Sequence, residues 1–196
     1  MKRLLSVLAP GLLALLPVHA DVDLTPHFQS IAGGLINRAY FADGQKQFAV
    51  TIDGETTLAA DHGGAIFRFT NVAQASMTFQ PSPFKNPPTF TPEFLPDYTK
   101  VAQKMLPASA EGVELASEAA NVLPINKWQS YRFIFTYHIG ALGFQESVTF
   151  LNLDSGQQIV IRTGSHRKDF PNVAQRADDT LRRWHEVQPG DEIGAN

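Results

Sequence analysis

One stretch of the chain decides the fold: residues 131–163, which read YRFIFTYHIGALGFQESVTFLNLDSGQQIVIRT. Residues 131–139 carry an aromatic or β-branched side chain at every second position, as expected of a strand with one buried face. Residues 145–153 and 157–163 continue this alternation after turns that contain glycine. The stretch therefore predicts three antiparallel strands in sequential order, a β-meander.

After residue 164 the apolar side chains recur every three or four positions, which is the period of an α-helix. Pro171 suits the first helical turn, and Pro189-Gly190 predicts that the helix ends near Val187. Because this helix and the meander each have one apolar face, we expect the helix to lie across the sheet. The apolar stripe of the helix consists of Phe170, Val173, Ala174, Ala177, Leu181 and Trp184.

The first half of the chain contains four shorter runs with the pattern of strands. Asp53-Gly54 predicts a hairpin between the first two runs, and Asp61–Gly64 predicts the next turn. Thr25-Pro26 favours a short helix that ends at Ile31, followed by a second element up to Phe41. The four runs are residues 45–52, 55–60, 65–70 and 76–80.

Residues 81–92 are rich in proline, which predicts an extended connector of polyproline II character inside one domain. A helix is expected next, starting at Glu93 or Leu95 and ending at Met105. Residues 113–122 fit either a helix or a strand, and we favour a strand because the segment leads directly into the meander. These elements together predict an α+β fold, an antiparallel sheet covered by helices.

Residues 1–20 have the pattern of a secretory signal peptide: Lys2 and Arg3 precede an apolar run, and cleavage is expected after Ala20. The apolar run, residues 4–16, is shorter than the roughly 20 residues of a membrane span. We therefore expect export to the periplasm or the extracellular space, with no stable membrane insertion after cleavage. The predicted divisions are a signal peptide (1–20), a lead-in segment (21–44), a single domain (45–188) and a tail (189–196).

The chain has no cysteine, which excludes disulfides, thiolate metal ligands and cysteine nucleophiles. Its net charge is −3, and removal of Lys2 and Arg3 with the signal peptide leaves 14 basic against 19 acidic residues, a net charge of −5. A mildly acidic chain does not attract nucleic acid through its bulk charge, so we expect no nucleic-acid partner.

The order of elements resembles the PsbP/Mog1-like α/β/α sandwich, over roughly residues 45–187. The local sequence is similar to the second half of that fold around residues 131–133, 145–150 and 157–161. Members of this group, which includes small exported bacterial domains, mostly act as binding or assembly factors. The resemblance therefore implies a binding domain, although a fold by itself does not fix a function.

Three histidines are candidates for a binding site. His62 lies beside Asp61 in a predicted turn, His138 shares a strand face with Arg132, and His166 lies just before the last helix. The alternatives are a surface turn for His62 and partly buried, hydrogen-bonded side chains for Arg132 and His138. No two histidines have the spacing of metal ligands, so we predict no metal site, no cofactor and no catalytic residue.

Two other segments are candidates for ligand or partner binding. Phe84 and Phe90 lie in the proline-rich connector, where aromatic side chains form either a ligand mouth or a protein-docking patch. The alternative is that they cover one end of the core. Residues 164–169 combine a glycine, two basic residues and the start of a helix, which suits an anion, whereas the alternative is a solvated loop with a helix cap.

The sequence thus predicts an exported, non-enzymatic domain that binds a protein partner or a small ligand. The alternative is a periplasmic hydrolase or metal-dependent enzyme whose histidines are brought together by the fold. That alternative requires His62, His138 and His166 to lie within about 4–6 Å of one another, with a carboxylate behind them.

Overall fold

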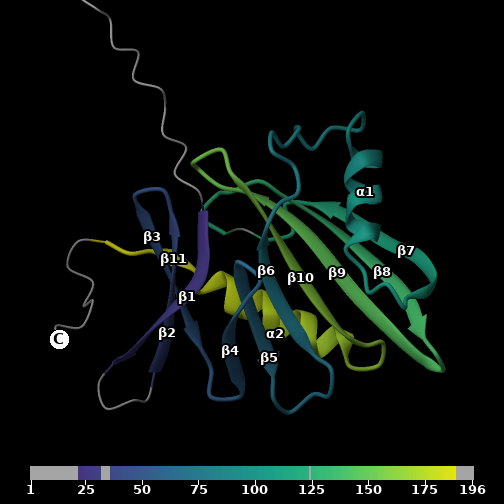
Figure 1. Cartoon of the computed structure of the whole chain (residues 1–196), viewed down its shortest axis with the longest axis horizontal. Helices are drawn as coiled ribbons and strands as arrows, with labels where there is room; N and C mark the ends of the chain where they lie inside the picture. Colours follow the sequence, from purple (N-terminus) through teal and green to yellow (C-terminus); the bar gives the residue numbers. More distant parts are fainter. Residues whose placement is uncertain (1–21, 32–35, 124, 189–196) are drawn as a thin grey trace, which may run out of the picture.

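The structure, a computed structural model, describes residues 22–31, 36–123 and 125–188 (Figure 1). Two antiparallel sheets and two helices make up this part of the chain. The four-stranded sheet has the order β1 (Val22–Ile31), β2 (Ile36–Asp43), β3 (Lys46–Ile52) and β11 (His185–Glu186). The seven-stranded sheet has the order β4 (Thr56–Asp61), β5 (Gly64–Phe69), β6 (Ser76–Pro81), β10 (Gln158–His166), β9 (Leu142–Asn152), β8 (Ser130–Ile139) and β7 (Glu111–Ala120).

The predicted meander is confirmed as β8, β9 and β10, which pair antiparallel in sequential order. Its register places Tyr131, Phe150 and Val160 side by side on one face of the sheet. Strand β10 also pairs with β6, so the meander and the earlier strands form one continuous sheet. The α+β class is therefore confirmed.

The second helix, α2 (Phe170–Arg182), covers one face of the large sheet, as its apolar stripe predicted. Its buried side chains and Trp184 pack with Ile161 of β10 and with residues of the four-stranded sheet, such as Phe41. The Trp184 ring stacks on Phe79 with 5.1 Å between centroids. The helix ends at Arg182, earlier than predicted, and the chain then enters β11 beside β3. We call this side of the sheet the α2 face.

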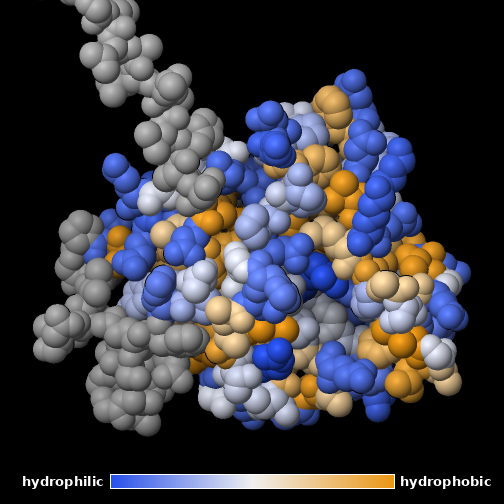
Figure 2. All heavy atoms as spheres, viewed as in Figure 1, coloured by the Kyte–Doolittle hydropathy of each residue, from blue (hydrophilic) through white to orange (hydrophobic). Residues whose placement is uncertain are grey.

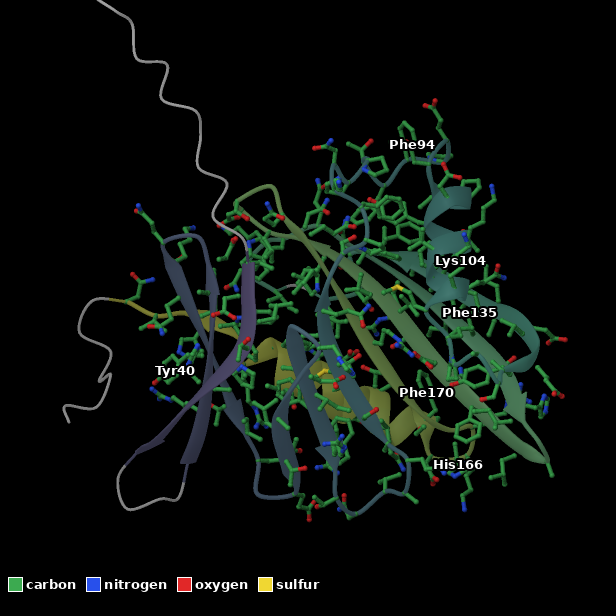
Figure 3. The ribbon with its side chains drawn as sticks, in the orientation of Figure 1. Tyr40, Phe94, Lys104, Phe135, His166 and Phe170 are labelled. Carbon is green, nitrogen blue, oxygen red and sulfur yellow. The ribbon has the colours of Figure 1, made fainter. Side chains whose placement is uncertain are left out.

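The first helix, α1 (Leu95–Lys104), lies on the opposite face, which we call the α1 face. Tyr98 and Ala102 of this helix are buried against Phe133, Phe135 and Phe150 of the meander. Figure 3 shows Phe94 and Lys104 at the two ends of α1, with Phe135 on the sheet beneath it. The helix covers only the upper part of this face in the view of Figure 1, and this limit leaves room for the site described below.

The helix predicted up to Ile31 is wrong, because residues 22–31 form strand β1. Pro26 is compatible with a strand here for two reasons. Strand β1 lies at the edge of its sheet, and its register with β2 is interrupted between Asp23 and His27. At an edge or a bulge the missing proline N–H costs no ladder hydrogen bond. By contrast, the strand expected at residues 113–122 is confirmed as β7.

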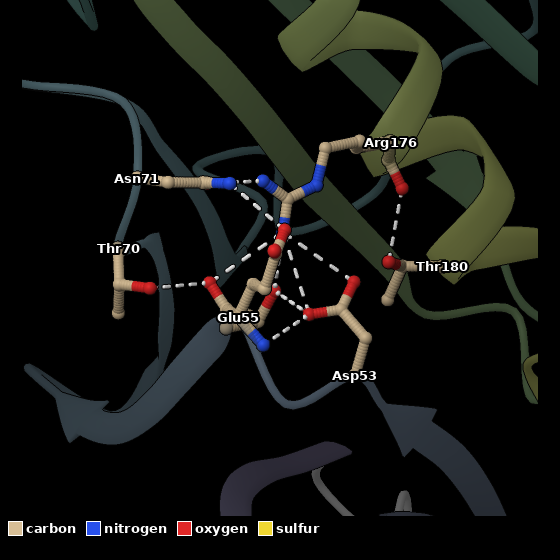
Figure 4. A network of polar contacts seen from close by, with 7 residues as sticks. Asp53, Glu55, Thr70, Asn71, Arg176 and Thr180 are labelled. Atoms are coloured by element: carbon tan, nitrogen blue, oxygen red, sulfur yellow. Dashed lines mark hydrogen bonds and ion pairs between the residues drawn. The ribbon is translucent and has the colours of Figure 1, made fainter.

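The hairpin predicted at Asp53-Gly54 is also wrong, because β3 and β4 belong to different sheets. Asp53 accepts hydrogen bonds from the Glu55 backbone N–H and the Thr56 hydroxyl, which turns the chain out of the first sheet. Arg176 of α2 reaches the Asp53 carboxylate at 3.4 Å and Asn71 at 2.7 Å (Figure 4). This network ties α2 to the crossing between the sheets.

Within the described residues, no helix combines the length and the apolar character that crossing a membrane requires. The predicted signal peptide and tail lie outside the described residues.

Candidate functional site

A cavity of about 330 Å³ lies on the α1 face, where that face is not covered by α1. Polar residues of β6 and the turn before it line one side, and apolar residues of the β8–β9 hairpin line the other. Figure 2 views this face and shows hydrophilic and hydrophobic atoms side by side below α1. The lining residues are Gln74, Ser76, Thr78, Pro107, Tyr137, Ile139, Leu142, Phe144, Glu146, Arg162, Gly164 and Ser165.

The strand register explains why these residues meet. Glu146 of β9 lies opposite Gly164 of β10, which in turn lies opposite Ser76 of β6. One pair further along the strands, Arg162 lies opposite Thr78. A Cβ atom at position 164 would lie 3.3 Å from Glu146 Cγ, so glycine leaves the space that the Glu146 side chain occupies.

A polar cluster of three side chains forms one wall of the cavity. The Tyr137 hydroxyl donates a hydrogen bond to Glu146 Oε2 at 2.9 Å, and Arg162 Nε donates one to Oε1 at 2.7 Å. Arg162 Nη2 lies 2.6 Å from the same Oε1. Glu146 is only 4% exposed, so these two partners replace the water that its carboxylate would otherwise bind.

Burial, strengthened by the nearby Glu146 carboxylate, raises the pKa of Tyr137 far above its ordinary value. Tyr137 is therefore a neutral hydroxyl at physiological pH and acts as a hydrogen-bond donor. It does not supply a phenolate nucleophile. The cluster is consequently suited to binding and orienting a ligand.

Two donor groups of the cavity lack partners among the described residues. Arg162 uses Nε and Nη2 on a single carboxylate oxygen, which leaves Nη1 without a hydrogen bond to the described part of the chain. The Thr78 hydroxyl oxygen is buried and has no hydrogen-bond partner there either. Buried polar groups are nearly always satisfied, so the Thr78 hydroxyl calls for an explanation, and a ligand is one. The Arg162 side chain is 25% exposed, so its Nη1 is open to solvent or to a ligand.

Of the residues predicted from sequence, His166 lies closest to this cavity. Its ring stacks on Phe144 with 4.6 Å between centroids, and Phe144 stacks on Tyr137 at 5.7 Å. His166 also lines a second hollow of about 560 Å³ with Leu142, Arg167 and Lys168. The two hollows share Leu142, so the segment predicted to bind an anion borders the cavity.

Arg132 and His138 lie on the other face of the sheet. Arg132 donates two hydrogen bonds to Asp178 of α2, at 2.8 and 3.2 Å, and a third to the Thr149 hydroxyl at 3.0 Å. These bonds hold α2 against the sheet. His138 is exposed near the end of β8, opposite Glu111 of the edge strand β7.

His62 lies in the β4–β5 turn with its side chain 97% exposed, 3.8 Å from the Asp61 carboxylate. Four strands separate β4 from β8 in the sheet, a distance on the order of 24 Å from His138. His138 and His166 lie on opposite faces, since His166 shares a face with Tyr137, the neighbour of His138. Across the described ranges, no group of three or more His, Cys, Asp or Glu side chains is placed to hold a metal ion.

Phe84 and Phe90 both pack on Tyr98 of α1, with ring centroids 4.7 and 5.1 Å away. Phe90 also contacts Tyr131 at 5.8 Å, and both phenylalanines are partly buried. The proline-rich connector therefore covers the upper end of the α1 face with these two rings.

Sequence reasoning missed Tyr137, Glu146 and Arg162 as site residues. A signal was present, because Glu146 and Arg162 each lie two positions from a buried valine, Val148 and Val160, and so share its strand face. A charged residue on the inward face of a strand needs a partner, and these two have opposite charge. The strand register was required to show that they meet.

No family model matches the sequence, and no curated protein shows significant similarity to it. Among solved structures, cyanobacterial PsbP (CyanoP) from Synechocystis sp. PCC 6803 is similar, with a TM-score of 0.51 and 12% identity over 84% of this chain and 94% of that chain. LpqN of Mycobacterium tuberculosis, involved in cell envelope biogenesis, has a TM-score of 0.48 and 10% identity, over 83% of this chain and 92% of its own. The Saccharomyces cerevisiae Ran-binding protein Mog1p has a TM-score of 0.46 and 8% identity, over 83% of this chain and 95% of its own.

Identities this low concern the fold alone, and the CyanoP alignment spans most of both chains. The fold resemblance inferred from element order is thereby confirmed. The chain has a PsbP-like fold.

Proposed function

We propose that this protein is an exported, non-enzymatic domain that binds a small ligand in the cavity on the α1 face. The observation that carries the proposal is the cluster of Tyr137, Glu146 and Arg162 in the cavity wall. The cluster joins three neighbouring strands, contacts no helix through these bonds, and lines the cavity. Ligand sites in proteins commonly have this character, an apolar hollow with a few well-placed polar groups.

Export is supported by the pattern of residues 1–20, with two basic residues, an apolar run and a small residue at the expected cleavage point. A non-enzymatic role is supported by the chemistry of the cavity. Tyr137 is held in its neutral form, and Glu146 already accepts hydrogen bonds on both oxygens. Neither group is poised as a nucleophile or a general base.

The histidine-based hydrolase or metalloenzyme receives no such support. Its three histidines lie in a turn, on the α2 face and on the α1 face, and the required separation of about 4–6 Å is not met. Docking of a protein partner through Phe84 and Phe90 remains a prediction. Both rings are half-buried against Tyr98, which leaves only part of each side chain for a partner.

The proposal is tested by native mass spectrometry of the full chain, expressed in a Gram-negative host and recovered from the periplasm. We expect cleavage near Ala20 and an additional non-covalent mass on the monomer. Ser76→Phe places a large ring in the cavity and should remove that mass. The matched control is Thr57→Phe, at an exposed strand position outside this cavity, which should retain the mass.

A clean monomer with no added mass, for wild type and control alike, would contradict ligand binding. A pull-down with Phe84→Asp and Phe90→Asp variants would then test the protein-partner prediction. Loss of association at an unchanged melting temperature would support docking, whereas loss of stability would identify both residues as core.

A further inference from the structure

We infer that the ligand is a small amphipathic carboxylate, whose acid group binds the outward donors of Arg162 and whose aromatic or aliphatic body lies against the β8–β9 hairpin. This inference rests on the proposed binding function of the cavity and specifies the chemical class of its ligand. Three features of the site support it: a polarity gradient, a local excess of positive charge and a row of stacked rings.

The cavity changes from polar to apolar across the sheet. The β6 side carries Ser76, Thr78 and, from the turn before the strand, Gln74, while the hairpin side carries Ile139 and Leu142. Arg162 lies on β10, opposite Thr78, and therefore belongs to the polar side. A ligand that satisfies both sides has one hydrogen-bonding end and one apolar end.

The charge around the cavity favours an anion, although the chain as a whole carries a net charge of −3. Arg167 and Lys168 line the adjoining hollow, are exposed, and form no ion pair with the described residues. Asp169 is the acidic residue of that loop, and Glu146 is already paired with Arg162. The local balance is therefore positive, which attracts an anionic group.

The hydrogen-bonding geometry favours a single carboxylate over other charged groups. Arg162 keeps Nη1 and one Nη2 hydrogen for a ligand, and a planar guanidinium edge matches the two oxygens of a carboxylate. A dianion such as a phosphate monoester would be repelled by Glu146, which lies 2.6 Å from the same guanidinium. A cation would find no unpaired carboxylate in the cavity lining.

The apolar side of the cavity is lined by aromatic and aliphatic side chains that can contact the body of the ligand. The rings of Tyr137, Phe144 and His166 form one row across β8, β9 and β10, with interplanar angles of 12° and 28°. Leu142 is 52% exposed, the more exposed of two large hydrophobic side chains at the described surface, and it joins the two hollows. A ring or a short chain lying along this row would cover Leu142.

The inference is tested by titration calorimetry with three probes that share a body and differ in the head group: 4-phenylbutanoate, 4-phenylbutanamide and 4-phenylbutylamine. The protein is the signal-cleaved chain, freed of co-purified ligand. We expect the carboxylate to bind about tenfold more tightly than the amide, and the amine not to bind. Binding of the carboxylate should weaken as salt is added.

Three variants identify the site. Thr78→Val keeps the shape of the side chain and removes a hydroxyl that has no hydrogen-bond partner, so the melting temperature should hold or rise while carboxylate binding weakens about threefold. Arg162→Lys keeps the charge and loses the planar edge, and should weaken carboxylate binding about tenfold. Leu142→Ala should weaken all binding about fivefold, whereas Leu115→Ala, at the other exposed leucine (41%), should change nothing.

Equal affinity for all three probes, with Leu142→Ala weakening each of them, would overturn the carboxylate assignment and leave the proposed binding function standing. The inference would also be overturned if the affinity for the carboxylate stayed unchanged in Thr78→Val, Arg162→Lys and Leu142→Ala. Failure of the proposed function is a separate result, since it is the absence of a co-purified mass.

Discussion

Within the described part of the chain, two largely buried arginine–carboxylate pairs lie on opposite faces of the same sheet, and their structural roles differ. Arg132 on the α2 face bonds to Asp178 through both terminal nitrogens and to Thr149 through Nε. All three of its nitrogens have protein partners, and the pair fixes a helix. Arg162 on the α1 face bonds through two nitrogens to one oxygen of Glu146, a residue of the neighbouring strand, and fixes no helix.

This difference in bonding distinguishes a pair that stabilises the fold, Arg132 and Asp178, from a pair that lines the proposed binding site, Arg162 and Glu146. Where helix α2 covers the sheet, every part of the guanidinium is used and the surroundings are filled by a continuous apolar core. Where α1 does not cover the sheet, the Arg162 guanidinium contacts Glu146 through Nε and Nη2 only, and an open cavity lies beside it. An unpaired donor edge next to a hollow is thus more informative about function than the burial of a charge.

The strongest perturbation of the α2 face is Trp184→Ala. Trp184 is buried and its ring contacts Phe41, Phe48, Phe79 and Trp128. Its truncation should lower the free energy of unfolding by about 3–5 kcal/mol, measured by urea denaturation. Leu142→Ala on the α1 face, at a largely exposed side chain, should lower it by less than about 0.5 kcal/mol. Equal losses at the two sites would contradict the division between a filled and an open face.

The pair on the α1 face is broken by Arg162→Met. Glu146 is then left buried with Tyr137 as its one remaining donor, so we expect a loss of about 3 kcal/mol. Glu146→Gln in the same background removes the uncompensated charge and should restore about half of that loss. The control is Glu146→Gln in the wild-type background. If Glu146→Gln lowers the free energy of unfolding equally in the wild type and in Arg162→Met, the two residues are not coupled.

The pair on the α2 face is tested by Asp178→Asn, which keeps the shape of the side chain and removes its charge. The two charge-assisted hydrogen bonds from Arg132 weaken, and we expect a loss of about 1–2 kcal/mol. Ligand affinity should be unchanged, because Asp178 lies on the face opposite the cavity. A change in affinity comparable to that of Arg162→Lys would show that the two pairs are not separate in function.

The smallest effect concerns the contact between α2 and Asp53. Burial raises the pKa of Asp53, but hydrogen bonds from Thr56 and the Glu55 backbone and the charge of Arg176 outweigh it, so the pKa is lower than usual. Because the pKa is lower in the folded state, the ionised carboxylate stabilises the fold at pH values above the unfolded-state pKa of about 3.9. This stabilisation is lost as the pH falls through the folded-state pKa. The melting temperature of Asp53→Asn should therefore approach that of the wild type as the pH drops below about 4. A constant difference between pH 6 and pH 3 would contradict this linkage.

Much of the fold follows from local pattern. The meander and both helices were predictable because their apolar side chains repeat with a clear period over nine or more residues. The errors at β1 and at the predicted Asp53-Gly54 hairpin arose where a local signal was overruled by the position of a strand in its sheet. Pro26 is compatible with β1 because that strand is an edge, and Asp53 turns the chain between sheets through Arg176, a residue more than a hundred positions away.

The site was less predictable than the fold, for a physical reason. Tyr137, Glu146 and Arg162 come from three strands, and their meeting depends on the register of β8 with β9 and of β9 with β10. The three histidines were considered because histidine is a common catalytic and metal-binding residue, but the structure places them in a turn and on opposite faces of the sheet. The anion-binding segment at residues 164–169 was the one prediction that lay beside the cavity, and Gly164 belongs to both.

The central claim, that the cavity on the α1 face holds a ligand, is tested most directly by methyl NMR. The spectrum of the protein recovered from the periplasm is compared with that of the same sample after denaturation, ligand removal and refolding. We predict that the methyl signals of Ile139 and Leu142 shift between the two samples, while those of Ile161 and Leu181 on the α2 face do not. Identical spectra, or changes confined to Leu95 and Val101 of α1, would contradict the claim.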